Sequence, residues 1–471
     1  MTQPGFSTGS RDIMDSAEVL AALAAAVPPE ALIIDRDVTR SLSHDEAEWA
    51  PVGEPLALIR ATSSDQVAAT VRTCAHFGVP VTARGAGTGL SGGANAIDGG
   101  VIIALDRLNQ IRLIDPLERL AVVQAGVIND ELRAAAAEQG LWYPPDPASS
   151  PWSTIGGNIA TNAGGVCCVK YGVTKDYVLA LEVVTGTGEL VRLGRVTAKG
   201  VAGYDLVGLM VGSEGTLGIV TEATVRLKPL PAPPRTIVGY FNSIVAAGEA
   251  ARGVAQAGII PSALELIDRH CLAAVDKWKN MGLSVEADVV LLGRIDDPGM
   301  AGDDLADQML ACFETAGATW AARSTDEEEA EALFAARRLA YPALERLGPV
   351  LTEDVCVPIA AVPEMLARVD RIAIEHDILI ASIAHIGDGN LHPLLIAEPG
   401  DTAAQNRAKI AFEEILSAAL DLGGTVTGEH GVGLLKRGGL SRELSPAVLE
   451  MHRAVKAALD PHHILNPGKV F

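Results

Sequence analysis

Three glycine-dense segments constrain the fold of this chain more than any other feature of its sequence. The first, Arg84–Gly93, contains a literal Gly-x-Gly-x-x-Gly that starts at Gly87. In a Rossmann fold a helix follows these glycines, but here residues 94–100 are turn-like and a strand, Val101–Leu105, is expected next. The pattern therefore favours a loop whose backbone N–H groups bind an anion over a Rossmann site or a plain turn.

The other two segments are Pro144–Gly165 and Gly212–Val220. Prolines fix the backbone of the second segment, and its paired glycines allow a flat ring or a phosphate to approach the main chain closely. The second segment is also mostly uncharged, which argues against a plain surface loop. Because all three segments adjoin predicted strands or helix ends, we expect one extended dinucleotide to lie across them.

Strands and helices with short connections are predicted around these segments. Strands at Pro55–Ala61 and Pro80–Arg84 flank a helix, Gln66–Phe77, that Gly78 ends, so a β-α-β unit is expected here. Further elements are expected as strands Leu120–Val127, Leu179–Thr185, Glu189–Leu193 and Gly218–Leu227 and as a helix from Asn129 to Glu138.

A proline-dense segment, Lys228–Pro234, divides the chain, because such a run continues neither a helix nor a sheet. Beyond it, charged amphipathic helices alternate with short apolar strands, which is typical of an α+β domain. Pro342 is expected to end the helix Asp326–Ala340. The other expected elements are helices Ala301–Ala316, Ala361–His376, Thr402–Leu422 and Ser445–Leu459 and strands Val289–Arg294, Ile378–His385 and Pro393–Ile396.

Charge and composition narrow the class of protein. The 37 Lys and Arg against 59 Asp and Glu give a net charge of −22, which argues against nucleic acid or anionic lipid as the main partner. Six cysteines without a C-x-x-C pair predict reduced thiols in a cytoplasmic protein, without a zinc knuckle or iron–sulfur ligands. No apolar run approaches the ~18 residues of a membrane span, so we expect no integral membrane segment.

Two histidines flank a predicted turn in the second half of the chain. Asp388-Gly389 is a strong signal for a two-residue hairpin turn, and such a turn places His385 directly opposite His392. Opposed residues have Cβ atoms about 4.5–5.5 Å apart on one face, so both imidazoles can converge on one divalent metal. Two hydrogen-bonded histidines at a strand end are the alternative, but an opposed pair favours the metal.

The segment Thr427–Gly433 supplies further candidate groups. In a strand Glu429 and His430 would face opposite sides, but the flanking glycines permit a tight turn that directs both into one site. Glu429 would then be a third, anionic ligand, which leaves positions open for substrate oxygens. His430 would be a general base, while a Glu-His pair on the surface is the alternative interpretation.

Six segments occur together and in one order: Arg84–Gly93, Pro144–Gly165, Gly212–Val220, His385–His392, Gly428–Gly431 and Leu465–Lys469. In this combination the chain resembles the FAD-linked D-2-hydroxyacid dehydrogenases of the vanillyl-alcohol-oxidase-like flavoprotein superfamily. Within that superfamily, the resemblance is to D-lactate dehydrogenase, D-2-hydroxyglutarate dehydrogenase and the flavin subunit of glycolate oxidase. The likeness covers roughly residues 50–471.

The resemblance implies an α+β fold: a two-part FAD-binding domain of the vanillyl-alcohol-oxidase/PCMH type with an α+β substrate-binding cap domain. The expected divisions are 1–233 for the FAD-binding domain, 234–424 for the cap, and 425–471 for a C-terminal segment that completes the FAD and active site. The loop at Thr88 has no histidine for covalent attachment, so non-covalent FAD is expected. The resemblance assigns to FAD binding Arg84, Gly85, Ala86, Gly87, Thr88, Gly89, Leu90, Ser91, Gly92, Pro145, Asp146, Gly156, Gly157, Asn158, Ala160, Asn162, Gly164, Gly165, Tyr171, Glu214, Gly218, Ile219, Val220 and Asn466.

The resemblance also implies roles in catalysis. It assigns His385, His392 and Glu429 to a divalent metal, zinc or manganese, and His430 to proton abstraction. An arginine on a cap helix clamps the substrate carboxylate in this family, and Arg337 is the candidate, with a solvated helix charge as the alternative. The expected reaction is oxidation of a D-2-hydroxy acid to the 2-oxo acid by hydride transfer to flavin N5.

The segment Thr352–Pro358 favours the D-lactate branch, because the 2-hydroxyglutarate enzymes place a basic side chain where this chain has Leu351–Asp354. D-lactate or a related monocarboxylate is therefore the expected substrate, with D-2-hydroxyglutarate and glycolate as alternatives. A metallohydrolase and a flavin subunit that only relays electrons are alternatives from other classes.

Partners and location are expected only in outline. The electron acceptor stays open among a quinone, a cytochrome, an electron-transfer flavoprotein and oxygen. The oligomeric state stays open as well, with a homodimer among the expectations. A cytoplasmic location is expected, and attachment to the periphery of the inner membrane is left open.

Overall fold

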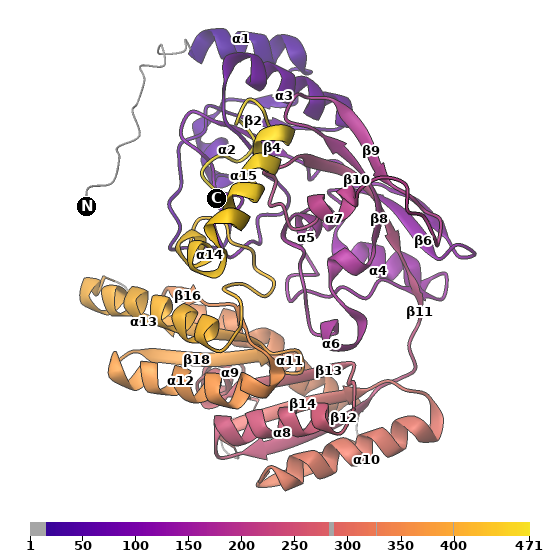
Figure 1. Cartoon of the computed structure of the whole chain (residues 1–471), viewed down its shortest axis with the longest axis vertical. Coiled ribbons are helices and arrows are strands. Elements are labelled where there is room, and N and C mark those ends of the chain that lie inside the picture. The colour runs from indigo at the N-terminus through magenta and orange to yellow at the C-terminus, as the bar shows by residue number, and fades with distance from the viewer. Residues whose placement is uncertain (1–15, 282–286, 326, 399) are drawn as a thin grey trace.

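The chain folds into two large regions that face each other across a central gap between ribbons (Figure 1). The computed structural model describes residues 16–281, 287–325, 327–398 and 400–471. The N-terminal region carries three sheets, and the region that follows it carries a single large sheet. The chain then returns, and α14 (Arg437–Glu443) and α15 (Pro446–Leu459) lie beside the N-terminal region, drawn in yellow in Figure 1.

The first sheet of the N-terminal region is built from the β-α-β unit. Its order is β1-β2-β4-β3, and β4 pairs in parallel with both of its neighbours. Ser63 caps the connecting helix through its hydroxyl, and Gly78 ends it with φ of 65°, as a left-handed C-cap requires. The elements are β1 (Leu32–Ile33), β2 (Ala57–Arg60), β3 (Val81–Arg84), β4 (Val101–Ala104), α1 (Ser16–Ala26), α2 (Arg36–Ser41) and α3 (Ser64–Phe77).

The second sheet is antiparallel throughout, in the order β5-β6-β10-β8-β9. Residues 94–100 contain no helix, so the Arg84–Gly93 loop does lead into a strand, β4. The elements are β5 (Ile111–Asp115), β6 (Leu120–Gln124), β8 (Val178–Val184), β9 (Leu190–Gly194), β10 (Ile219–Arg226), α4 (Asn129–Ala137), α5 (Ile155–Thr161), α6 (Cys168–Tyr171) and α7 (Leu206–Met210).

The second region is an antiparallel sheet covered by helices on both faces. Its order is β15-β12-β14-β13-β18-β19-β16, with β17 paired to β19. The strands are β12 (Arg235–Phe241), β13 (Ala263–Asp268), β14 (Val289–Ile295), β15 (Trp320–Arg323), β16 (Val350–Thr352), β17 (Val355–Cys356), β18 (Leu379–His385) and β19 (Asn390–Ile396). The helices are α8 (Ile244–Gln256), α9 (Arg269–Lys279), α10 (Gly299–Thr315), α11 (Glu327–Glu345), α12 (Val362–Glu375) and α13 (Thr402–Asp421).

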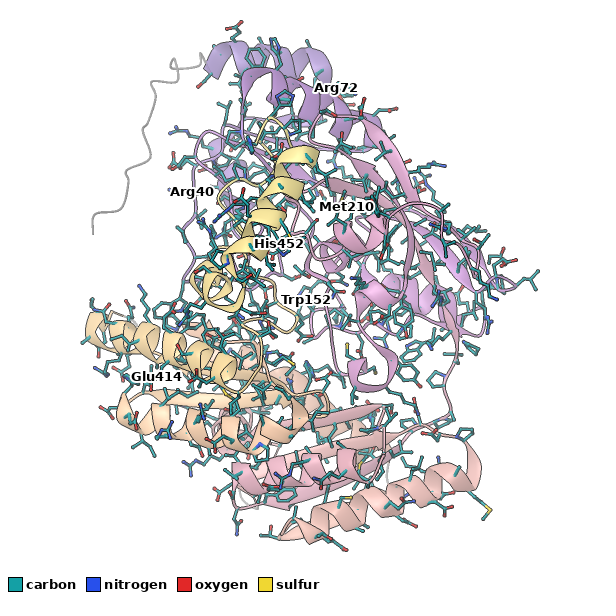
Figure 2. The ribbon with its side chains drawn as sticks, viewed as in Figure 1. Arg40, Arg72, Trp152, Met210, Glu414 and His452 are labelled. Atoms are coloured by element: carbon teal, nitrogen blue, oxygen red, sulfur yellow. The ribbon has the colours of Figure 1, made fainter. Side chains whose placement is uncertain are left out.

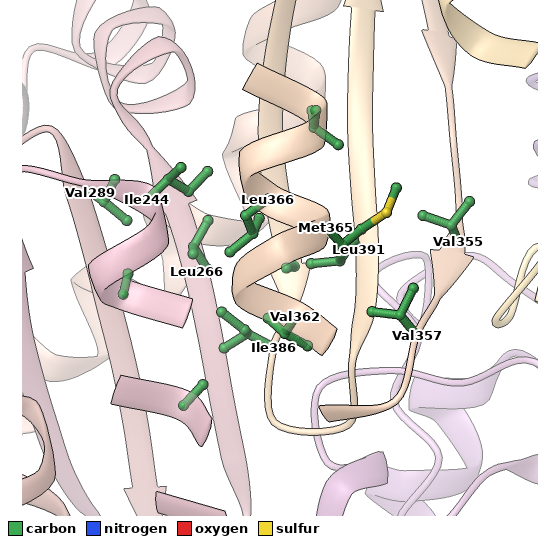
Figure 3. Packing of buried hydrophobic residues seen from close by; sticks show 14 of the residues in the cluster. Ile244, Leu266, Val289, Val355, Val357, Val362, Met365, Leu366, Ile386 and Leu391 are labelled. Carbon is green, nitrogen blue, oxygen red and sulfur yellow. The ribbon is translucent and has the colours of Figure 1, made fainter. Parts of the chain in front are cut away.

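Strand alternation separates two apolar cores in this sheet. Leu266 of β13 belongs to the core under α8, α10, α12 and α13, and Figure 3 shows it near Leu366 and Ile386. Ile267, the next residue, belongs to the other core, under α9 and α11. Polar side chains of β13 and β18 that share the second face therefore lie beneath α11.

Two expectations about prolines are wrong. The helix expected to stop at Pro342 continues to Glu345, because Ala343 and Leu344 beyond the proline are buried in the core beneath α11. Lys228–Pro229 forms a short strand, β11, paired with β7 (Leu141–Trp142), so the proline run does enter a sheet for two residues. The expected start of the same helix at Asp326 lies outside the described residues.

The C-terminal tail closes the first sheet. Leu465 forms a parallel bridge with Val81 of β3, and the amide of Asn466 donates to the Val81 carbonyl at 2.7 Å. None of the helices in the described portion of the chain is both long and apolar enough to cross a lipid bilayer. The division into ranges 1–233, 234–424 and 425–471 stays a prediction.

Candidate active site

His385 and His392 lie on one face of the β18–β19 ribbon, but in a register other than expected. His385 pairs with Asn390, and His392 pairs with Ile383. The connection between the strands has four residues, 386–389, rather than two. A two-residue type I′ turn at Asp388-Gly389 would need positive φ at both residues, and Asp388 does not have a positive φ. The shift is by an even number of residues, so both imidazoles keep the same face and their ring centroids lie 5.2 Å apart.

Glu429 completes a group of three possible metal ligands. Its Oε1 lies 3.2 Å from Nε2 of His385 and 3.3 Å from Nε2 of His392. Donors around a tetrahedral zinc ion with bonds of about 2.0–2.2 Å lie about 3.3–3.6 Å apart. The three side chains therefore fit one divalent ion, and their nitrogen and carboxylate donors suit zinc or manganese.

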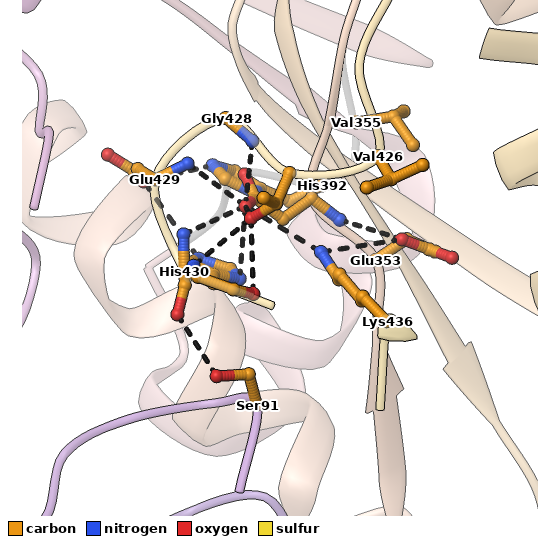
Figure 4. Close-up of polar contacts among 12 residues, drawn as sticks. Ser91, Glu353, Val355, His392, Val426, Gly428, Glu429, His430 and Lys436 are labelled. Atoms are coloured by element: carbon orange, nitrogen blue, oxygen red, sulfur yellow. Dashed lines mark hydrogen bonds and ion pairs between the residues drawn. The ribbon is translucent and has the colours of Figure 1, made fainter. Parts of the chain in front are cut away.

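His430 lies against the same group. Its ring stacks on that of His392 with centroids 4.9 Å apart, and its Nε2 lies 3.9 Å from Oε1 of Glu429. Gly431 and Gly433, both with positive φ, allow the tight turn that directs both side chains inward. Ser91 of the first glycine segment donates to the His430 carbonyl, so this turn also meets the N-terminal region (Figure 4).

Asp354 holds this turn, a role that the sequence patterns did not predict. The side chain is completely buried, and its Oδ2 accepts from the Thr427 hydroxyl at 2.7 Å. The same oxygen accepts backbone N–H bonds from Gly428, Glu429 and His430 at 2.8–3.0 Å. Its sequence signal is weak, because an acid before β17 looks like any strand-end carboxylate.

Buried charges surround this group (Figure 4). Burial lowers the pKa of His430 to about 4. Burial raises the pKa of Glu353 to about 8, although Lys436 opposes this shift. Burial would also raise the pKa of Asp354, but His430 and Lys436 beside it hold that pKa below its ordinary value. Lys436 is itself buried, with Nζ 3.6 Å from both carboxylates.

Arg337 lies on α11, is 5% exposed and points into the site region rather than into solvent. Its Nε forms an ion pair of 2.9 Å with Glu265 of β13. Glu265 is completely buried and its other oxygen lies 2.7 Å from Nδ1 of His385. Arg337 is therefore not a solvated charge on the helix surface, which was the alternative interpretation. Substrate binding by Arg337 stays a prediction.

One cavity joins these groups to the glycine segments. Its volume, open mouth included, is about 1870 Å³, and it extends from the first glycine segment to His385, His392, Glu429 and His430. Trp152 and Met210, both labelled in Figure 2, border it from the N-terminal region. The residues expected at FAD that border it are Arg84, Gly85, Ala86, Gly87, Thr88, Gly89, Leu90, Ser91, Gly156, Gly157, Asn158, Ala160, Gly164, Glu214, Gly218, Ile219 and Val220.

These borders fit a flat, phosphate-bearing cofactor. Nε of Arg84 and Nδ2 of Asn158 are buried and have no hydrogen-bond partner among the described residues, so donors are available. A Cβ at Gly164 would collide with Glu429, and one at Gly85 would collide with Thr154, so these positions leave room for no side chain. The cavity can therefore hold FAD, the group that the resemblance implies.

Seven residues expected at FAD do not border the cavity, and their contact with FAD stays a prediction. Asp146 accepts from the amide and thiol of Cys167, and the Tyr171 hydroxyl donates to Asp296. The side-chain amide of Asn466 donates to the backbone carbonyls of Gly93 and Glu214. The remaining members of this set are Gly92, Pro145, Asn162 and Gly165.

Family comparisons cover both regions of the chain. Residues 230–470 match the family described as FAD linked oxidases, C-terminal domain, and residues 55–194 match the family described as FAD binding domain. The glycolate oxidase subunit GlcD of Bacillus subtilis (strain 168) is 42% identical over 88% of this chain and 89% of its own length. The D-lactate dehydrogenase of Anaerostipes hadrus is 34% identical over 94% of this chain and 95% of its own.

Solved structures share the fold at low sequence identity. The 4-ethylphenol oxidase from Gulosibacter chungangensis, in its isoeugenol complex, covers 96% of both chains with a TM-score of 0.80 at 18% identity. A substrate-bound p-cresol methylhydroxylase gives the same score and coverage. The fold is therefore the α+β fold of vanillyl-alcohol-oxidase-like, PCMH-type flavoproteins, as the sequence predicted. The chain belongs to the FAD-linked oxidoreductases of the GlcD and D-lactate dehydrogenase family.

Proposed function

We propose that this chain oxidises a D-2-hydroxy acid, a monocarboxylate such as D-lactate, to the 2-oxo acid. The observation that carries the proposal is one cavity bordered by the glycine segments, by the His385–His392–Glu429 group and by Arg337. The names of relatives at 34% and 42% identity support the same class of substrate.

Each residue has a role that follows from its place. His385, His392 and Glu429 hold a divalent ion, zinc or manganese, and Arg337 binds the substrate carboxylate, for which a planar guanidinium is suited. His430, stacked on His392, takes the hydroxyl proton. When bound, the divalent ion would supply a Lewis acid for the substrate hydroxyl, and non-covalent FAD would supply the acceptor for the hydride of the substrate carbon.

The choice of a monocarboxylate rests on the resemblance, because Leu351–Asp354 has no basic side chain where the 2-hydroxyglutarate enzymes place one. Tyr341, Thr352, Ile383 and Leu394 border the cavity and are uncharged, and Arg338 borders it as well. Glu353 and Asp354, which follow Thr352, point into the buried network with Lys436. Glycolate is the second candidate, because the GlcD relative is 42% identical and glycolate needs no room for a methyl group.

The test is anaerobic reduction of the flavin by a panel of acids, followed as loss of its visible absorbance. D-lactate is expected to bleach the flavin, whereas L-lactate and D-2-hydroxyglutarate are not. Bleaching by glycolate alone would favour the second candidate. A flavin that responds to no hydroxy acid until a partner protein is added would favour an electron-relaying subunit instead.

A further inference from the structure

One buried carboxylate contacts two residues to which the proposed function gives a role: a metal ligand and the arginine that binds the substrate carboxylate. Glu265 lies in the middle of β13 with no exposed surface. Its Oε1 lies 2.7 Å from Nδ1 of His385, and its Oε2 lies 2.9 Å from Nε of Arg337. The first partner is a ligand of the metal group, and the second is the candidate anchor for the substrate carboxylate.

The fold brings these three residues together from distant positions. Ile267 of β13 pairs with Ile383 of β18 in an antiparallel register, so Glu265, two residues before Ile267, and His385, two residues after Ile383, share one face. Helix α11 covers that face and supplies Arg337. A carboxylate in such a core is costly unless it is paired. Oε1 of Glu265 lies at hydrogen-bond distance from His385, and Oε2 forms an ion pair with Arg337 that lacks hydrogen-bond geometry.

The contact with His385 defines the state of the imidazole. A carboxylate beside Nδ1 keeps the proton on that nitrogen, so Nε2 presents its lone pair toward His392 and Glu429. Carboxylates that orient a ligating histidine in this way raise metal affinity, typically by about 10–100-fold. The contact with Arg337 fixes the guanidinium at the border of the same cavity.

We propose that Glu265 is a positioning residue that sets the geometry of the metal ligand His385 and of the carboxylate anchor Arg337 together. The inference rests on the proposed function of both residues. It predicts that neutralising one side chain weakens metal binding and substrate binding at once, although Glu265 contacts neither ligand.

The test compares E265Q with a matched control, D268N, in the FAD-loaded protein. Asp268 is a buried acid on the same strand that accepts from the amides of Cys271 and Ser382 instead of from metal ligands. Zinc and manganese affinities are measured by competition with a chelator, without substrate. E265Q is expected to bind the ion about 10–100-fold more weakly, whereas D268N binds it like the parent chain.

The second readout is the Michaelis constant for D-lactate at saturating metal. E265Q is expected to raise KM about tenfold or more while FAD stays bound, because Arg337 loses its fixed partner. Parent-like metal affinity and KM in E265Q would overturn the proposal. A parent chain that binds no divalent ion would instead contradict the proposed function itself.

Should E265Q not fold, E265D keeps the buried charge but shortens its reach by one methylene. The same fall in metal affinity is expected, because one short carboxylate cannot contact His385 and Arg337 at once. Parent-like affinity in E265D would then overturn the proposal.

Discussion

Gly164 borders the large cavity at the point where it meets Glu429, one of the three proposed metal ligands. A Cβ added there would lie 3.2 Å from Cβ of Glu429 and would collide with its Oε2. We expect G164A to displace the Glu429 carboxylate and to lower zinc or manganese affinity at least tenfold, measured by chelator competition. G438A is the control, since a Cβ at Gly438 in α14 meets no atom within 4 Å. Equal metal affinity in both variants would contradict the assignment of Glu429.

Because Glu214 is buried, we expect the stability of the FAD-free protein to depend on pH. Its carboxylate accepts from the amides of Val432 and Gly433, but burial raises its pKa to about 7 from an ordinary 4.5. The folded state therefore holds this proton more tightly than the unfolded state, and its stabilising effect is complete below pH 4.5 and is lost as the pH rises through 7.

The measurement is the melting temperature of the parent chain and of E214Q between pH 4.5 and 8. The glutamine cannot ionise, so E214Q is expected to gain stability relative to the parent as the pH rises, by about 3 kcal/mol in all. Any loss of hydrogen bonding in E214Q adds a constant offset. A difference that does not change with pH would show that Glu214 is ionised throughout.

The turn Thr427–Gly431 depends on Asp354 rather than on its own sequence. Four donors from this turn converge on one oxygen of Asp354. We expect D354N to speed amide hydrogen exchange of Gly428, Glu429 and His430 and to weaken metal binding, since an amide offers one acceptor instead of two. D401N, which alters the exposed cap of α13, should leave exchange in the turn unchanged. Unchanged exchange in D354N would contradict this role.

The elements also show which features of the site a sequence can predict. The sequence predicted correctly that His385 and His392 share one face, because side chains alternate along a strand. The predicted two-residue turn was wrong, but the register shift of two residues kept both side chains on that face. The inward turn at Glu429 follows from its flanking glycines. Asp354 and Glu265 could not be found, because their roles come from pairing of strands and from a helix that covers them, which no local pattern encodes. The predicted end of the helix at Pro342 was wrong, because burial of the residues beyond it outweighs the backbone hydrogen bond that the proline lacks.

The whole molecule depends on the return of the tail to the N-terminal region. Asn466 bonds to carbonyls of Gly93 and Glu214, in or beside two glycine segments, and Lys469 also donates to Gly93. We therefore expect N466A to lower FAD content after gel filtration. H462A, a change at an exposed tail residue, should retain FAD. Full flavin content in N466A would show that the glycine segments hold their shape without the tail.

The central claim is that residues from two distant stretches hold a divalent ion at one end of the flavin cavity. The most direct measurement is the single-turnover rate of flavin reduction by D-lactate in metal-stripped and metal-reloaded protein, for the parent chain and for H385A. We predict that reloading with zinc or manganese restores rapid reduction in the parent and not in H385A, while both keep FAD. Rapid reduction in the stripped parent, or in H385A, would contradict the account.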